Sequence, residues 1–84
     1  MVIEKLLSEI LGDTKVEEKD YPKVDWLQVD GNAFSVMGKA KKAWRKLDAG
    51  VASRIAPVCM KGDYDTLLAL CIALCPEGDE EEND

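Results

Sequence analysis

The apolar residues of segment 32–47 recur at intervals of three and four, and this spacing constrains the fold more than any other feature. They are Ala33, Phe34, Val36, Met37, Ala40, Ala43, Trp44 and Leu47. Such spacing places them on one face of an amphipathic helix, whereas a strand alternates every second residue. Asn32 is the predicted N-cap, because its side-chain oxygen can accept a free N–H of the first turn. We therefore expect a helix that ends near residues 48–50 and buries Phe34 and Trp44.

The polar face of this helix carries much of the positive charge of the chain: Lys39, Lys41, Lys42, Arg45 and Lys46. Cations near a helix C-terminus are favoured by the helix dipole, which is one explanation for the cluster. The other explanation is a docking face for an anionic partner, to which Arg54 could contribute. Gly38 interrupts the helical pattern and costs about 1 kcal/mol relative to alanine. A glycine at this position predicts the close approach of another backbone.

Charge is segregated along the 84 residues. Residues 32–61 carry seven bases and one acid, whereas residues 1–31 carry eight acids and four bases, and residues 62–84 carry eight acids. The net charge of −6 argues against general DNA binding. A chain of this length buries only about 60–65% of its unfolded surface, which favours a homo-oligomer, most simply a dimer.

The N-terminal third of the chain predicts one helix and one extended segment. Residues 2–11 have apolar side chains on one face and predict a helix that Gly12 stops. Residues 13–20 are polar and predict a loop. Pro22 disfavours the helical conformation in Tyr21, and the imperfect alternation of side chains over residues 23–29 fits a short extended segment better than a helix. The sequence leaves open whether they form a true strand or pair across a dimer.

Residues 51–61 predict a third helix, whose start the sequence leaves open. If Ser53 caps this helix, Pro57 falls near the first turn, where its missing N–H is tolerated. If the helix starts at residue 50 instead, Pro57 lies inside it and kinks it.

The last helix begins after Asp63, a good N-cap, and Asp65 adds negative charge to its first turn. It is apolar almost all round until Pro76 stops it, so we expect it to form the core of the domain or the seam of a dimer. Across the chain, the residues with predicted turn or capping roles are Asp30, Gly31, Asn32, Gly62, Asp63 and Asp65.

These elements predict an all-α, or nearly all-α, fold: a small helical domain of about four helices with one short extended segment before the second. The domain spans residues 1–76, and the helix within residues 1–12 could be a separable element. Residues 77–84 carry six acids and are expected to form a disordered acidic tail. Such a tail could fold back over the basic helix and screen it from non-specific anions.

The residue types that most enzymes and metal sites need are scarce in this chain. It has no histidine and no glycine-rich phosphate loop, so we expect no nucleophilic catalysis and no cofactor. Asp30, Asp63 and Asp65 lack the pattern of a calcium loop and already have turn or capping roles. The three cysteines lack CxxC spacing and are expected to be buried, reduced thiols rather than zinc ligands. We therefore expect neither an enzyme nor a metal site.

Neither a secretory signal nor a membrane span is predicted. The first residues, Met-Val-Ile-Glu-Lys, place charge where a signal peptide needs an apolar core. The longest nearly uncharged run, residues 66–75, has about half the length of a membrane-spanning helix. The expected localisation is the cytoplasm, including the cytoplasm of an infected host.

Three pieces of the sequence resemble a family of small uncharacterised bacterial and phage proteins with a DGNAF…GDYD signature. The pieces are Tyr21-Pro22-Lys23-Val24, Asp30-Gly31-Asn32-Ala33-Phe34 with Gly38, and Gly62-Asp63-Tyr64-Asp65 with Leu67-Leu68. The resemblance covers about residues 21–75 and implies a small cytosolic or phage-encoded protein, without implying an activity. The chain departs from the family in its N-terminal helix, in Pro57 and in its acidic tail.

Together these features favour a small non-enzymatic binding protein, such as a phage-encoded accessory protein or an inhibitor of a host system. Its expected partner is a host protein or an anionic small molecule. The expected binding residues are Lys39, Lys41, Lys42, Arg45, Lys46, Arg54 and Trp26. The first alternative is a nucleic-acid-binding module, in which segment 39–46 holds phosphates while Trp26 and Tyr21 stack bases. An enzyme is the least favoured alternative.

Overall fold

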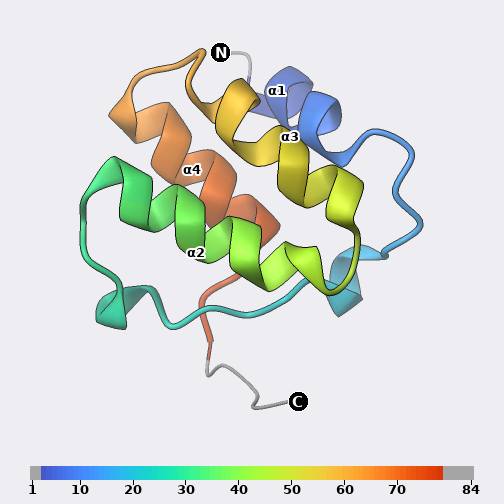
Figure 1. The fold of residues 1–84 in the computed structure, drawn as a ribbon, viewed down its shortest axis with the longest axis horizontal. Coiled ribbons are helices and arrows are strands. Elements are labelled where there is room, and N and C mark those ends of the chain that lie inside the picture. The colour runs from blue at the N-terminus through green and yellow to red at the C-terminus, as the bar shows by residue number, and fades with distance from the viewer. Residues whose placement is uncertain (1–2, 79–84) are drawn as a thin grey trace.

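The computed structural model describes residues 3–78 and is all-α, as the sequence predicted. Its four helices are α1 (Ile3–Leu11), α2 (Ala33–Arg45), α3 (Ala49–Cys59) and α4 (Tyr64–Leu74), and none of the described residues forms a strand (Figure 1). Two 3-10 turns, Glu18–Asp20 and Trp26–Gln28, lie between α1 and α2. Over the described range, no helix combines the length and the apolar character that a bilayer span requires.

The helices enclose one apolar core. α2 packs against α3 and α4, and α1 packs against the same two helices. Figure 1 shows α2 and α3 side by side, with the chain running in opposite directions along them. Each helix contributes a large side chain that is almost completely buried: Ile10, Trp44, Ile55 and Leu70. α1 is therefore packed into the core of its own chain.

Side-chain caps define where three of the helices begin. The Asn32 side chain accepts the N–H of Phe34 at 2.8 Å, and the Asp63 side chain accepts the N–H of Thr66 at 2.9 Å, which confirms both predicted caps. The cap of α3 is Asp48, whose Oδ1 accepts the N–H groups of Gly50 and Val51 at 3.0 and 3.2 Å.

The Asp48 cap shows which of the two predicted starting points of the third helix is closer to the structure. α3 begins at Ala49, so Pro57 lies inside it, and the alternative in which Ser53 caps the helix is wrong. The Ser53 hydroxyl instead donates to the Gly50 carbonyl at 2.8 Å. Because Asp48 starts a new helix, α2 ends at Arg45, earlier than the sequence predicted.

Helix α1 ends before Gly12, as the sequence predicted, and its C-terminus is also bonded to Arg54, which the sequence did not predict. Gly12 has a φ of +55°, which suits glycine, and its N–H donates to the Ser8 carbonyl at 2.8 Å. The Arg54 guanidinium of α3 donates to the carbonyls of Ile10 and Leu11 at 2.7 and 3.2 Å. These carbonyls have no partner within the helix, so a cation from α3 caps α1.

The extended segment predicted for residues 23–29 is wrong over Trp26–Gln28, which form a 3-10 turn, whereas Val29 after the turn is extended. Only Val24 pairs, as a single parallel bridge to Glu77 of the same chain. Its N–H donates to the Pro76 carbonyl at 3.0 Å, and its carbonyl accepts the N–H of Gly78 at 3.2 Å. The first two residues of the predicted acidic tail are thus hydrogen-bonded to the domain, and residues 79–84 lie outside the described residues.

Two tryptophan side chains donate hydrogen bonds to carbonyl groups at the C-terminal end of α4. Trp44 Nε1 donates to the Leu74 carbonyl at 3.0 Å, and Trp26 Nε1 donates to the Cys75 carbonyl at 2.7 Å. The ring of Tyr21 packs edge-on against Trp44, with 5.1 Å between the ring centroids. Since Pro76 cannot continue the helix, these two donors satisfy carbonyls that α4 leaves without a helical partner.

The outer surface of α2 differs from the prediction at two positions. Phe34 is 72% exposed, so its predicted burial is wrong, whereas Trp44 is fully buried as expected. The buried arc of the helix is narrower than the apolar pattern suggested and holds Val36, Met37, Ala40 and Trp44. A Cβ added at Gly38 would meet nothing within 4 Å, so no other described part of this chain makes the predicted close approach.

The three cysteines, Cys59, Cys71 and Cys75, are buried with free thiols, as the sequence predicted. The Cys59 and Cys71 thiols are hydrogen-bonded to each other. This hydrogen bond, together with burial, raises the pKa of Cys71 far above its ordinary value. The Cys71 thiol therefore stays protonated, while the same hydrogen bond lowers the pKa of Cys59, and both buried residues pack as small apolar side chains.

Candidate interaction surface on helix α2

The exposed face of α2 consists of two neighbouring lines of side chains, because an α-helix turns by about 100° per residue. The first line, which we call the basic stripe, contains Lys39, Lys42 and Lys46. The second line, which we call the outer stripe, contains Phe34, Gly38, Lys41 and Arg45. Every one of these residues is exposed except Lys39, which is half-buried. The structure thus keeps all five predicted α2 cations on one helix face.

Most of these cations are not used in holding the fold together. Among residues 3–78, nothing forms an ion pair or hydrogen bond with the side chain of Lys41, Lys42 or Arg45. Lys39 and Lys46 each take part in an interaction. The charge of the surface is therefore only partly compensated by the described part of the chain.

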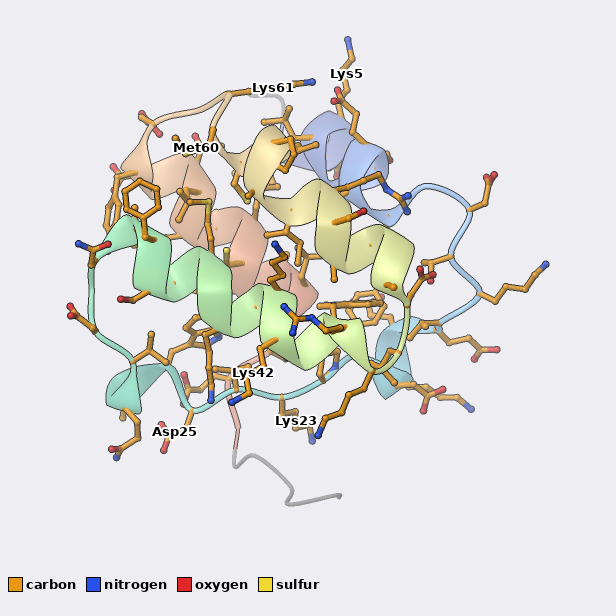
Figure 2. The ribbon with its side chains drawn as sticks, in the orientation of Figure 1. Lys5, Lys23, Asp25, Lys42, Met60 and Lys61 are labelled. Carbon is orange, nitrogen blue, oxygen red and sulfur yellow. The ribbon has the colours of Figure 1, made fainter. Side chains whose placement is uncertain are left out.

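Lys23 extends this positive surface from a different segment of the chain. It precedes Val24, which is buried and held by the hydrogen bonds to Pro76 and Gly78. A Cβ added at Gly78 would lie 2.9 Å from Lys23 Cδ, so the aliphatic stem of Lys23 lies along this glycine. Figure 2 shows Lys42 and Lys23 directed toward the same side of the molecule, with Asp25 farther along that side. Sequence reasoning missed Lys23, because only the pairing of Val24 with Pro76 and Gly78 places it on this side of the molecule.

Arg54 does not belong to this surface, so the prediction that placed it there is corrected. Its guanidinium is committed to the carbonyls of Ile10 and Leu11 at the end of α1. It also lies close to Asp48, and it helps to lower the pKa of that carboxyl. The larger contributions come from hydrogen bonds, first from the side chain of Thr14 and then from the N–H of Val51. Arg54 is a structural cation at the junction of α1 and α3.

Trp26 is likewise a structural residue. Its indole N–H is bonded to the Cys75 carbonyl, and its backbone N–H donates to Glu77 Oε1 at 3.2 Å. Tyr21, the other aromatic predicted to be free, packs on Trp44, and burial raises the pKa of its hydroxyl. Both rings are half-buried and make contacts that hold the fold together.

The two predicted turns, at residues 30–32 and 62–65, are in contact with each other. Asp30 Oδ1 accepts the N–H of Asn32 at 3.1 Å, and the Tyr64 hydroxyl donates to the carbonyl of Gly31. A Cβ on Gly62 would lie 2.8 Å from Thr66 Cγ2, so this turn needs a small residue. The predicted turn roles of these residues agree with the contacts that they make.

The carboxylates of these turns do not form a metal centre. The N–H of Thr66 lowers the pKa of Asp63 by hydrogen bonding to its carboxylate, and Asp65 is exposed in the first turn of α4. Within residues 3–78, no group of three or more histidine, cysteine or acidic side chains is placed to hold a metal ion.

Comparisons with protein-family models, with curated proteins and with solved structures find no match for this chain. The case for a function therefore comes from the geometry of its own residues.

Proposed function

We propose that this chain is a small non-enzymatic binding protein that holds an acidic protein partner on the basic stripe. Lys23 completes the surface beside Lys39, Lys42 and Lys46. The observation that carries the proposal is that Lys42 of α2 and Lys23 of the preceding connection are directed toward the same side of the molecule (Figure 2). Covering an acidic surface of another protein is one way in which such binding could inhibit a host system.

Three features favour an acidic protein over a nucleic acid as the partner. The chain carries a net charge of −6, which opposes the approach of a long polyanion. Trp26 and Tyr21 make contacts within the fold, and the exposed Phe34 lies on the outer stripe, so none of these rings lies on the basic stripe itself. Only a short row of cations is available, whereas nucleic-acid affinity rises with the number of phosphates contacted.

Neutralising the basic stripe is expected to abolish most binding to an acidic peptide. In the variant Lys39→Gln/Lys42→Gln/Lys46→Gln, the dissociation constant for a fluorescent decaglutamate peptide should rise about tenfold, since each exposed ion pair contributes about 0.2–1 kcal/mol. Fluorescence anisotropy at an ionic strength of about 0.1 M measures this change. The matched control is Lys5→Gln/Lys15→Gln/Lys19→Gln, which removes the same charge from exposed lysines elsewhere.

The control should change the dissociation constant by no more than about twofold, because charges beyond a Debye length of about 10 Å are screened. Equal losses in the two variants would mean that net charge alone drives binding, and would contradict the proposal. If an oligothymidylate binds more tightly than decaglutamate and its affinity falls steeply with salt, the partner is a nucleic acid instead.

Removal of residues 79–84 is expected to strengthen binding to decaglutamate at low salt, since the deleted segment adds five acids to the chain. The truncation should stop at Gly78, because Glu77 and Gly78 hydrogen-bond to Trp26 and Val24. The expected gain is about threefold to tenfold at low salt and should vanish as salt is raised, since screening removes it. An unchanged dissociation constant at every salt concentration would show that the acidic segment does not compete for the stripe.

A further inference from the structure

We propose that the acidic partner also carries an apolar side chain, which packs on the exposed ring of Phe34 while the acids of the partner lie over the cations farther along α2. This inference rests on the proposed function, because it names a second feature of the partner held on the same helix. The partner is then an acidic segment with an apolar anchor at one end. Two observations carry the inference: the exposure of Phe34, and the difference in charge between the two ends of the exposed face of α2.

Phe34 is the one large apolar side chain of α2 that is exposed. It lies in the first turn of the helix, where 72% of its surface is open to water. The Tyr64 hydroxyl donates to the carbonyl of Gly31, so a second ring, which is 42% exposed, lies at the same end of α2. An exposed aromatic ring gains free energy when an apolar group covers it. The start of α2 therefore offers an apolar contact that the described part of the chain leaves mostly open.

The two ends of the exposed face of α2 differ in charge. Toward its end, the side chains of Lys41, Lys42 and Arg45 have no ion-pair partner among the residues that the structure describes. Before its start, Asp30 is exposed in the turn that leads into the helix. A segment that is acidic throughout would bring carboxylates up to Asp30 as well as to the cations, and like charges repel. The face therefore suits a partner that is acidic at one end and uncharged and apolar at the other.

The rise of the helix sets the spacing of these groups in the partner. Lys41 and Arg45 lie about 10 Å and about 16 Å beyond Phe34 along the helix axis. An extended partner chain covers about 10 Å in three residues. Gly38 lies between Phe34 and Lys41 on the outer stripe and has no side chain that would hold the partner away from the helix. The apolar side chain of an extended partner is thus expected about three residues from its first acid.

The charges around Phe34 disfavour two other occupants of this face. A second copy that laid its own α2 here would set cations against cations. A nucleic acid with a base stacked on Phe34 would continue in both directions as a chain of phosphates, and so would bring phosphates up to Asp30. An acidic segment that ends in an apolar side chain meets neither repulsion.

The test compares two fluorescent peptides by anisotropy at an ionic strength of about 0.1 M. Both consist of hexaglutamate preceded by a diglycine spacer, and one starts with a pair of leucines whereas the other starts with a pair of serines. The leucine peptide should bind the full chain about tenfold more tightly than the serine peptide, because its leucines cover the ring of Phe34. In Phe34→Ser this advantage should fall below about twofold, while the dissociation constant of the serine peptide stays within about twofold of its wild-type value.

The matched control is Leu27→Ser, which removes an apolar side chain that is 89% exposed and lies outside α2. This variant should keep the tenfold advantage of the leucine peptide. Because Phe34 and Leu27 are both mostly in water, neither change should lower the melting temperature appreciably.

The apolar anchor and the proposed function fail in different ways. If neither peptide binds the wild type, the proposed function is wrong and the anchor with it. If the serine peptide binds but the leucines add nothing, only the anchor is wrong, and the same holds if their advantage survives Phe34→Ser or is lost in Leu27→Ser. A wild-type dimer that Phe34→Ser dissociates, or oligothymidylate binding that this change weakens without affecting the leucine peptide, would assign the ring to a second copy or to a base and would also overturn the inference.

Discussion

Replacing Trp44 with alanine is expected to lower the free energy of unfolding by about 3–5 kcal/mol, the largest effect of any single change considered for this chain. The Trp44 side chain is completely buried, packs against the ring of Tyr21 and donates its indole N–H to the Leu74 carbonyl. Alanine would leave a large cavity and an unpaired carbonyl at the end of α4. A chain of this size has about 4–13 kcal/mol of stability in total, so much of it would be lost.

Two milder variants separate the packing of Trp44 from its hydrogen bond. Trp44→Phe keeps an aromatic ring but removes the N–H, and should cost about 1–3 kcal/mol because the buried Leu74 carbonyl loses its donor. Trp26→Phe removes the corresponding bond to Cys75 at a half-buried site, where water can replace part of it, and should cost less. Urea unfolding followed by far-ultraviolet circular dichroism measures all three variants. If Trp44→Phe is as stable as the wild type, the cap on α4 contributes nothing.

The second large effect is expected for Arg54→Leu, which should destabilise the chain by about 2–4 kcal/mol, since hydrogen bonds to charged groups contribute about 1.5–3 kcal/mol each. The guanidinium provides two such bonds, to the carbonyls of Ile10 and Leu11, and it is the cation at the C-terminus of α1. Leucine keeps the apolar stem but removes the donor to the Ile10 carbonyl, whereas the Leu11 carbonyl still accepts the N–H of Thr14 at 3.0 Å. The same urea experiment reports the loss.

Two controls test whether the geometry of the Arg54 contact matters. Arg54→Lys keeps the charge but not the forked donors, so it should recover less than half of the loss. Lys61→Gln removes the other link between α1 and the end of α3, an ion pair of 2.7 Å to Glu9 whose partners are partly exposed, and should cost less than about 1 kcal/mol. If Arg54→Leu costs no more than Lys61→Gln, Arg54 is an ordinary surface residue. Arg54→Lys should also leave decaglutamate binding unchanged.

The helices of this fold could be predicted because their signals are local. Asn32 and Asp63 cap the helices that follow them, and Gly12 stops the first, since each needs only neighbouring backbone groups to act. The start of α3 could not be fixed from the sequence, because Ser53 is also a suitable capping residue for a helix that begins later. Asp48 prevails because its carboxylate accepts two N–H groups.

The errors concern contacts between residues distant in the sequence. Trp26 was expected to be free, but its indole N–H is bonded to a carbonyl 49 positions away. Arg54 was assigned to a binding face by its charge alone, whereas its bonds to α1 reach back 44 and 43 positions. Periodicity cannot reveal such pairs, because it gives the buried face of a helix without saying which carbonyls end nearby.

Phe34 shows a related limit within one helix. Its spacing fits the apolar pattern of α2, yet it is 72% exposed because it lies in the first turn, toward the edge of the arc that faces the core. The sequence therefore predicted the cations of the candidate surface, but it did not predict that Phe34 is exposed beside them. Lys23 was missed for the opposite reason, since only the pairing of Val24 with Pro76 and Gly78 brings it to the same side of the molecule as Lys42.

The most direct test of the binding surface is a titration of the isotope-labelled full chain with decaglutamate, followed by two-dimensional amide NMR. If the basic stripe is the binding site, the largest shift changes will fall on Lys39, Lys42, Lys46 and Lys23, and they will decrease in the Lys39→Gln/Lys42→Gln/Lys46→Gln variant. Changes of equal size at Lys5, Lys15 and Lys61 would contradict this assignment, because they would show that the peptide follows overall charge rather than a surface built by α2.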